Sequence, residues 1–220
     1  MKALPTLEEL FPHFAKLTPE QQAAVCDAAE ERHFPKGSKP HRGESDCSGV
    51  FLVRRGRLRA FILSETGREV TLYRLYPWDM CLFSASCVMN SIRFDIHVEA
   101  EADTDVFVVP ADVFDRLQKA SLPLSHYVNK LMAERFSDVV WVMEQILFKS
   151  LDSRLAAALQ EHRELAGSDV LDVTHDVLAR DLGTAREVVT RTLKYLAAEG
   201  MVSLSRGKIT VLDGEKLGKL

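Results

Sequence analysis

The sequence from Thr174 to Gly200, THDVLARDLGTAREVVTRTLKYLAAEG, predicts two helices separated by a tight turn. Thr174 is a residue type that caps helix N-termini, and Gly183 stands where the turn needs a left-handed backbone. The second helix is expected over residues 185–199, with Gly200 as the residue after its end. Two helices joined by a three-residue turn that contains glycine form the helix-turn-helix pattern, whose second helix enters the DNA major groove.

The residues that follow this pattern favour the same interpretation. From Val202 to Leu212 the sequence VSLSRGKITVL alternates around Arg206-Gly207, which predicts a β-hairpin, the wing of a winged-helix DNA-binding domain. The local charge agrees with a nucleic-acid partner. Residues 186–208 contain five Lys/Arg against two Asp/Glu, although the whole chain has a formal net charge of −4.

On the second helix, Glu187, Thr190 and Arg191 follow i, i+3, i+4 spacing and therefore share one face. Arginine can donate to guanine O6 and N7, and glutamate can accept from cytosine N4, so this face is suited to reading bases. Thr184 is expected to cap the helix and to touch phosphate through its hydroxyl or backbone N–H. The full set of predicted DNA contacts is Thr184, Arg186, Glu187, Thr190 and Arg191, with Lys194, Arg206 and Lys208 as phosphate contacts. The alternative is an ordinary exposed helix with a Glu187–Arg191 ion pair.

The first half of the chain has a different pattern. Short helices are expected over residues 5–31, one of them capped by Thr18, with Pro19 at its first position, and continuing to Glu31. From Phe34 to Val109, short apolar runs alternate with turns that contain glycine, which is typical of an antiparallel roll or barrel. The expected strands are 50–53, 58–63, 69–75, 96–100 and 105–110.

One long helix is expected between Pro123 and Lys149, because this stretch contains no glycine and no further proline. Some of its apolar residues step by four and three, the spacing of the core positions of a two-stranded coiled coil: Met132, Phe136, Val139, Met143 and Ile146. A second apolar face consists of Leu124, Val128, Leu131 and Val142. Since one face can pack on the chain's own sheet and the other on a partner, we expect a symmetric dimer. The alternative is a core helix within a monomer.

The composition, 46% apolar and 27% charged residues among 220, is that of an ordinary globular protein. No apolar run approaches the roughly 20 residues of a membrane span, and the N-terminus lacks the apolar core of a signal peptide. We therefore expect a cytoplasmic protein with no membrane partner, whose four cysteines are thiols. The common enzyme motifs, such as G-x-S-x-G and H-E-x-x-H, are absent from the sequence, so no enzymatic activity is expected. A thiol-based activity at Cys81 or Cys87 is the one enzymatic alternative.

The order of these elements resembles the cyclic-AMP receptor and fumarate-nitrate-reduction regulator (CRP/FNR) family of bacterial transcription factors. The resemblance covers nearly the whole chain, and its most specific parts are Gly56-Arg57-Leu-Arg-Ala, Gly67-Arg68-Glu69 and the second helix of the helix-turn-helix. It implies an α+β fold: an N-terminal antiparallel, jelly-roll-like β-roll sensor domain over 1–121, a long dimerisation helix over 122–149 and a winged helix-turn-helix over 150–220. It also implies a homodimer on double-stranded DNA, with RNA polymerase as a partner if the protein is an activator.

The resemblance narrows the DNA site to two alternatives. The family reads half-sites containing TGTGA or TTGAT with Arg-Glu-x-x-x-Arg or Glu-x-x-Ser-Arg. This sequence shares Glu187 and Arg191 with both patterns and Arg186 with the first, and it has Thr190 where the second has serine. The choice between the half-sites stays open. The alternative function is a cyclic-nucleotide-binding regulatory module without DNA binding, which would leave the helix-turn-helix and the hairpin unexplained.

The resemblance also places the effector site in the β-roll. Members that bind cyclic nucleotides carry Gly-Glu, whose Glu holds the ribose, and an Arg ten residues later that holds the phosphate. Counted from Trp78-Asp79, these positions fall on Leu82-Phe83 and on Arg93; counted back from the strand at Ile96, Phe94 replaces Arg93. Two apolar residues cannot accept a hydrogen bond from a ribose hydroxyl, so cyclic AMP is disfavoured.

The same segment contains Cys81 and Cys87, which suggest a redox or metal-dependent sensor. The alternative is that both are buried apolar filler. An iron–sulfur cluster is disfavoured, because relatives that hold one have cysteines clustered near the N-terminus, and Cys26 and Cys47 form no such cluster. Haem stays open as a cofactor. No residue is assigned as a metal ligand, His97 and His175 are expected to be ordinary histidines, and the small-molecule or redox effector stays unidentified.

Overall fold

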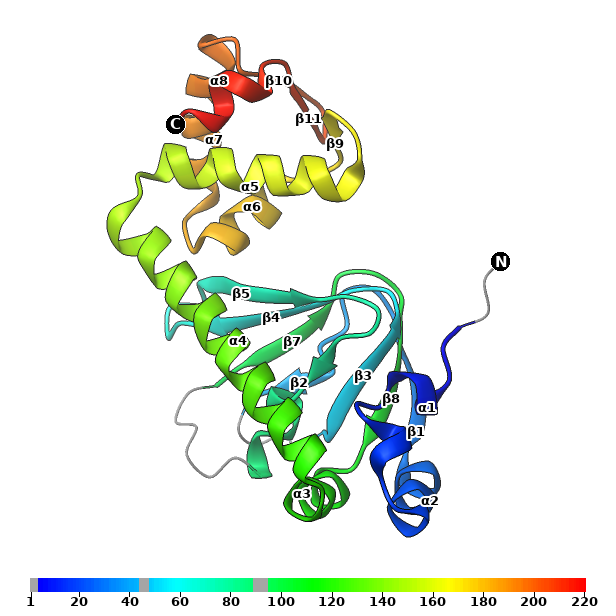
Figure 1. Ribbon diagram of the computed structural model, residues 1–220. Helices are drawn as coiled ribbons and strands as arrows, with labels where there is room; N and C mark the ends of the chain where they lie inside the picture. The colour runs from blue at the N-terminus through cyan, green and yellow to red at the C-terminus, as the bar shows by residue number, and fades with distance from the viewer. Residues whose placement is uncertain (1–3, 44–47, 89–94) are drawn as a thin grey trace. The chain divides into compact units, whose positions relative to one another are not determined.

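The computed structural model describes residues 4–43, 48–88 and 95–220 and divides the chain into two compact units. The first unit consists of Met1–Leu63 and Leu72–Val139, and the second of Ser64–Thr71 and Val140–Leu220. Figure 1 shows the elements of both units in chain order from blue to red. The expected fold class is confirmed: antiparallel sheets, then a long helix, then a helix-turn-helix with a small wing sheet. The expected domain bounds at 121 and 149 stay a prediction.

Short helical segments begin the described chain: α1 (Leu7–Leu10), η1 (Phe14–Lys16) and α2 (Pro19–Ala28). Thr18 caps α2 as predicted, since its hydroxyl accepts from the backbone N–H of Gln21. The expected continuation of this helix to Glu31 is wrong. The helix ends at Ala28 because Glu30 begins strand β1 (Glu30–Phe34), whose backbone pairs with strand β8 (Thr104–Val109).

Two four-stranded sheets form the roll, in the orders β1-β8-β3-β6 and β2-β7-β4-β5. Figure 1 labels these strands except β6, and the first three residues of β5 belong to the second unit. The remaining strands are β2 (His41–Arg42), β3 (Val50–Arg55), β4 (Leu58–Leu63), β5 (Glu69–Leu75), β6 (Met80–Cys81) and β7 (His97–Ala100). A short helix, η2 (Phe83–Val88), follows β6. The sequence analysis did not predict the two-residue strands β2 and β6, because two residues are too few to show the alternation of apolar and polar residues that is typical of a strand.

The turn between β3 and β4 needs its glycine. Gly56 has a φ of +93°, and a Cβ at this position would lie 2.5 Å from both the carbonyl oxygen of Asp103 and Oγ1 of Thr104. A side chain would therefore collide with the neighbouring strand as well as strain the backbone. This explains why a Gly-Arg step separates two apolar runs in the sequence.

Strand β3 of the sheet β1-β8-β3-β6 is buried on both faces along residues 50–53, whereas the edge strand β1 is largely exposed. Val50 and Leu52 of β3 pack with helix α3 (Ala111–Ala120) and the first turns of helix α4 (Leu122–Phe148). Phe51 and Val53 point the other way, into the core shared with the second sheet. Successive residues of a strand face opposite sides, so a continuous apolar run such as 50–53 is what a strand between two layers requires.

The long helix α4 spans 27 residues and confirms the prediction to within one residue at each end. Leu124, Val128 and Leu131, from the second apolar face predicted above, are buried in the core of the first unit. Val142, the last member of that face, is half-buried. The helix therefore anchors its N-terminal half in its own domain, as an amphipathic helix does.

The second unit contains helix α5 (Leu151–Ala166), the helix-turn-helix, the wing and a final short helix, α8 (Gly214–Gly218). Its sheet has the order β10-β11-β9, with β9 at Val170–Leu171, β10 at Val202–Ser205 and β11 at Lys208–Val211. Residues 64–71 belong to the same unit: the hydroxyl of Thr71 donates to Oδ1 of Asp181 at 2.7 Å.

Candidate nucleic-acid interface

The helix-turn-helix consists of α6 (His175–Leu182) and α7 (Arg186–Ala198), and both helices agree with the prediction to within a residue. Thr174 caps α6, since its hydroxyl accepts from the N–H of Val177. Gly183 follows α6 with a φ of +65°, and a Cβ here would lie 2.6 Å from Cγ2 of Val70. The left-handed backbone and this close approach both call for glycine at the turn.

The inner face of α7 anchors it in the unit. Val189, Leu193 and Leu196 have no exposed surface, and Thr192 is buried beside them. The neighbouring apolar residue Val188 is only half-buried. Burying three large apolar side chains at 3.6-residue spacing determines which face of α7 points outward.

The outward face of α7 carries the charged side chains that were predicted to contact DNA. Arg186, Glu187, Arg191 and Lys194 are all exposed. In the described structure no ion pair joins Glu187 to Arg191, so the alternative of a simple intrahelical pair has no support there. Because three of these four side chains are cationic, the face favours an anionic partner.

Thr190 lies on the same helix but has a different environment. It is half-buried, and its hydroxyl donates to the carbonyl oxygen of Arg186 at 2.9 Å. Nδ1 of His175, at the start of α6, lies 2.8 Å from the same hydroxyl oxygen. A second contact joins the two helices, since Nη1 of Arg186 lies 3.5 Å from Oδ2 of Asp176. The sequence analysis treated His175 as an ordinary histidine, because the pairing of residues 15 apart depends on how the two helices cross.

The role expected of Thr184 needs a correction. Ala185, and not Thr184, is the N-cap residue of α7, and no side chain among the described residues caps this helix. The N–H of Thr184 donates to the carbonyl oxygen of Ala179 at 3.0 Å, so it is not available to a phosphate. Because the turn is tight, this N–H forms a hydrogen bond with a carbonyl oxygen in the last turn of α6. Only the hydroxyl of Thr184 stays a predicted phosphate contact.

The wing is a tight hairpin of β10 and β11, in which Ser205 lies opposite Lys208. Arg206 and Gly207 form the two-residue turn, and Gly207 has a φ of +75°. Arg206 and Lys208 are both exposed, whereas Ile209 is buried in the core of the unit. The alternation of the hairpin thus holds one face in the core and leaves two cationic side chains at its tip.

The C-terminal half of α4 carries a large exposed apolar surface. Of the predicted dimer residues, Phe136 is 71% exposed, Met143 54% and Ile146 44%. Met132 and Val139 are half-buried against the core of the first unit. The sequence analysis missed four more exposed apolar residues of this helix: Val140, Trp141, Leu147 and Phe148. Soluble monomers rarely expose so much contiguous apolar surface, which favours a protein partner.

Apolar side chains occupy the position at which the family resemblance places the Gly-Glu pair. Leu82 and Phe83, which fall on the Gly-Glu position, are buried. The rings of Phe83 and Tyr73 lie 6.3 Å apart, and the guanidinium of Arg135 lies 4.6 Å from the Tyr73 ring. Burial raises the pKa of the Tyr73 hydroxyl well above its ordinary value. Aromatic side chains thus occupy this part of the interior, a feature the sequence analysis did not predict.

Cys81 is buried, with 1% of its surface exposed. Burial raises the pKa of its thiol, and hydrogen bonds from Ser84 oppose this effect only in part. Arg93, Phe94, Cys47 and the side chain of Cys87 lie outside the described residues. Of the two cysteines in the redox hypothesis, the structure therefore describes the side chain of Cys81 alone. Its burial favours the neutral thiol.

The β2-β7-β4-β5 sheet carries buried charges that the sequence analysis did not single out. Nη2 of Arg59 lies 2.6 Å from Oε2 of Glu99, and both residues are buried. Nearby, Arg57 and Arg74 both contact Glu101, at 2.7 and 2.9 Å. Arg59 of β4 lies directly opposite Glu99 of the neighbouring strand β7, so each of these two charges compensates the cost of burying the other.

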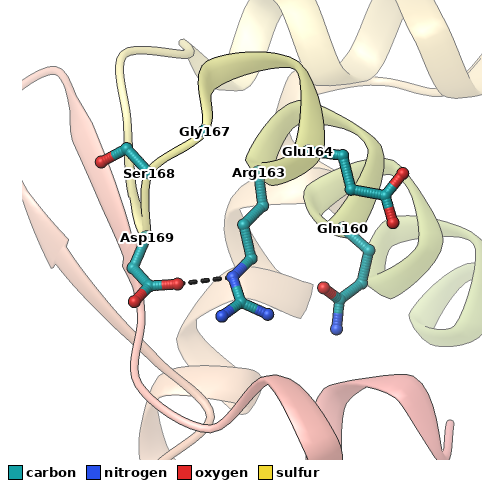
Figure 2. Close-up of a pocket in the computed structure, with 6 residues that line it drawn as sticks. All are labelled: Gln160, Arg163, Glu164, Gly167, Ser168 and Asp169. Atoms are coloured by element: carbon teal, nitrogen blue, oxygen red, sulfur yellow. Dashed lines mark hydrogen bonds and ion pairs between the residues drawn. The ribbon is translucent and has the colours of Figure 1, made fainter.

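Figure 2 shows a pocket of about 380 Å³ at the C-terminal end of α5. Its polar lining includes Gln160 and Arg163 from the helix and Ser168 and Asp169 from the loop that follows it. Nε of Arg163 lies 2.5 Å from Oδ1 of Asp169, so the cation of this pocket is already paired. No residue of α6, α7 or the wing lines it, and we assign it no role in binding DNA.

Two features are absent from the described part of the chain. No cluster of three or more His, Cys, Asp or Glu side chains could hold a metal ion there. None of its helices combines the length and apolar character needed to span a bilayer.

Comparison with known proteins agrees with the geometry. A family described as the Crp-like helix-turn-helix domain matches residues 153–220. The transcriptional regulator SdrP of Thermus thermophilus is 32% identical, over 78% of this chain and 83% of the relative. The cyclic AMP receptor protein of the same organism is 27% identical, over 95% and 96%. A crystal structure of a protein assigned to the CRP/FNR transcriptional regulators of Eubacterium rectale has a TM-score of 0.92 and 48% identity, over 96% and 97%.

Proposed function

The chain belongs to the CRP/FNR family of DNA-binding transcription regulators, and from this premise we propose that it acts as a homodimer on palindromic DNA under the control of an effector sensed by its β-roll. Two copies of α7 would enter successive major grooves, roughly 34–36 Å apart, and each would read one half-site. The dimer would form along the exposed apolar face of α4.

One observation carries this proposal: the buried inner face of α7 directs Arg186, Glu187, Arg191 and Lys194 outward, beside a wing with two exposed cations. Arg191 is suited to guanine and Glu187 to cytosine, whereas Lys194, Arg206 and Lys208 are suited to phosphates. The half-site then contains either TGTGA or TTGAT.

Selection from a pool of random duplexes with the purified full-length protein tests the proposal. We expect enrichment of a palindrome whose two halves are centred about 10 base pairs apart. Enrichment of single half-sites, or of no sequence at all, would contradict the proposed mode of binding. Sedimentation of the free protein at the same concentration measures the dimer independently.

The proposed effector of this chain is not cyclic AMP. The side chains of Leu82 and Phe83 are buried and offer no acceptor to a ribose hydroxyl, and the buried ring of Tyr73 lies 6.3 Å from that of Phe83. The effector would act on the segment from Cys81 to Arg93, as a different small molecule or a redox signal. Calorimetric titration with cyclic AMP should give no binding heat, and a saturable heat would refute this part of the proposal.

An absorbance spectrum with metal analysis of protein purified without air separates haem, iron–sulfur and cofactor-free forms.

Replacing Lys208 with alanine should weaken binding to all duplexes alike. The wing lysine is assigned to a phosphate, so the substitution removes one ionic interaction per half-site without altering sequence preference. We expect the slope of log affinity against log salt to fall in magnitude by about 1 for each phosphate that is no longer neutralised. Lys219→Ala is the control, because Lys219 follows α8 and pairs with Glu215. A change in sequence preference by Lys208→Ala would contradict the assignment.

Cys81 should resist alkylation while the protein is folded. Burial raises its thiol pKa, so the reactive thiolate is scarcer at neutral pH than for an ordinary cysteine, and labelling should accelerate only as the pH rises beyond the ordinary thiol range. Mass spectrometry of iodoacetamide-treated protein measures each site separately. At pH 7, exposed Cys26 should be labelled first, and Cys81 should be labelled at that pH only after unfolding by urea. Equal labelling of both in the folded protein at pH 7 would instead favour Cys81 as a redox sensor.

A further inference from the structure

His175 contacts helix α7, the second helix of the helix-turn-helix, through the hydroxyl of Thr190. That hydroxyl has one proton, which it donates to the carbonyl oxygen of Arg186 at 2.9 Å. Nδ1 of His175, 2.8 Å away, must therefore be the donor in the second bond. The hydrogen-bond pattern thus assigns the proton to Nδ1 in the neutral imidazole, and the same bond persists when the ring is doubly protonated.

Two bonds to one hydroxyl restrict the side chain that carries it. Threonine in a helix divides its population between two rotamers, because its hydroxyl can form a hydrogen bond with a carbonyl oxygen of the preceding turn. The donor from His175 favours the rotamer in which the oxygen points to α6 and to the backbone of α7. Since Cβ carries only a hydroxyl, a methyl and a hydrogen besides its backbone bond, fixing the hydroxyl there turns the methyl away from α6.

From this geometry we propose that His175 is a positioning residue that makes Thr190 present its methyl group, and not its hydroxyl, to the major groove. The group that such a methyl recognises is the C5-methyl of thymine, which marks that base in the major groove. The inference rests on the proposed function, because it concerns which base α7 prefers. It places the selection of thymine at one position of each half-site under the control of a residue on the neighbouring helix.

Replacing thymine with uracil tests the methyl contact directly, because uracil lacks only the C5-methyl. The full-length protein is titrated with its selected duplex and with duplexes that carry uracil at each thymine position in turn. At one position of each half-site we expect uracil to lower affinity about fourfold, the effect of one buried methyl group. Thr190→Ser should abolish this discrimination, and Thr190→Val should keep it.

Variants of His175 test the positioning role. His175→Leu removes the donor, so the thymine preference should fall below about twofold. His175→Asn should restore it, because the Asn amide nitrogen can replace Nδ1 as donor to the hydroxyl. In the Thr190→Val background, His175→Leu should have no further effect, since valine has no hydroxyl to position. His126→Leu, on α4, is the control for a histidine-to-leucine change outside the helix-turn-helix.

The outcomes separate this inference from the proposed function. If the natural sequence selects no site, the proposed function has failed. If it selects a site but uracil never weakens binding, or if His175→Leu keeps the full thymine preference, the inference alone is wrong. Thermal unfolding and binding to non-specific DNA show whether each variant is folded. His175→Ala serves in place of His175→Leu if the latter does not fold, with the same expected loss.

Discussion

A protein carrying both Phe136→Glu and Met143→Glu is expected to sediment as a monomer and to bind its palindrome about 10²- to 10⁴-fold more weakly than the natural sequence. The two residues occupy equivalent positions of the four-and-three repeat of α4, and they are 71% and 54% exposed. A dimer holds its second recognition helix at a high effective concentration near the second half-site, and a monomer lacks that advantage.

Control measurements accompany this double variant. Glutamate is a good helix former and both positions are exposed, so α4 should stay folded, which circular dichroism checks. Binding to a duplex with a single half-site should change little. Ser137→Glu places the same charge next to the seam and should leave the dimer intact. A double variant that still sediments as a dimer would show that the partner docks on another surface, such as the one formed by Trp141 and Phe148.

Replacing Arg191 with alanine should remove most of the sequence preference of the protein. A bidentate contact from arginine to guanine is worth about 1–3 kcal/mol, and the palindrome contains two copies, so specific binding should weaken by about 2–6 kcal/mol. This corresponds to roughly 30-fold to 10⁴-fold. Binding to random duplex should fall far less. Competition titrations with selected and random DNA measure the ratio of the two affinities.

Arg191→Lys distinguishes base reading from simple charge. Lysine keeps the charge but lacks the planar fork that matches O6 and N7 of guanine, so it should recover non-specific affinity and little of the preference. A lysine variant with the full preference of the natural sequence would contradict the bidentate contact. Equal reductions in affinity for selected and random DNA, seen with both Arg191→Ala and Lys208→Ala, would contradict both role assignments.

Local signals in the sequence predicted the helix-turn-helix closely. Thr174 satisfies an N-terminal N–H group of α6, and Gly183 takes the left-handed conformation that follows it. The buried positions of α7 follow the period of the helix, so the exposed face was predictable from the same pattern. The long helix α4 was predictable for a similar reason, because it contains no residue that would end it.

Other features depended on residues that are distant in the chain. Helix α2 ends before Glu30 because β8, more than seventy residues away, pairs with the next strand. The contact between His175 and Thr190 depends on the crossing of α6 and α7, and the backbone bond of Thr184 depends on how tightly the turn closes. Local propensities are weak compared with such tertiary interactions, which override them.

The sequence by itself determined the class of molecule, because caps, glycine turns and apolar periods act within a few residues of one another. It therefore identified the winged helix-turn-helix, the roll and the long helix with an apolar seam. Only the tertiary structure decided that Phe83 and Tyr73 are buried with their rings close together, that Cys81 is buried, and that the hydroxyl of Thr190 faces α6 and His175. Burial and hydrogen-bond geometry are properties of the space between elements, and no single stretch of the chain contains that information.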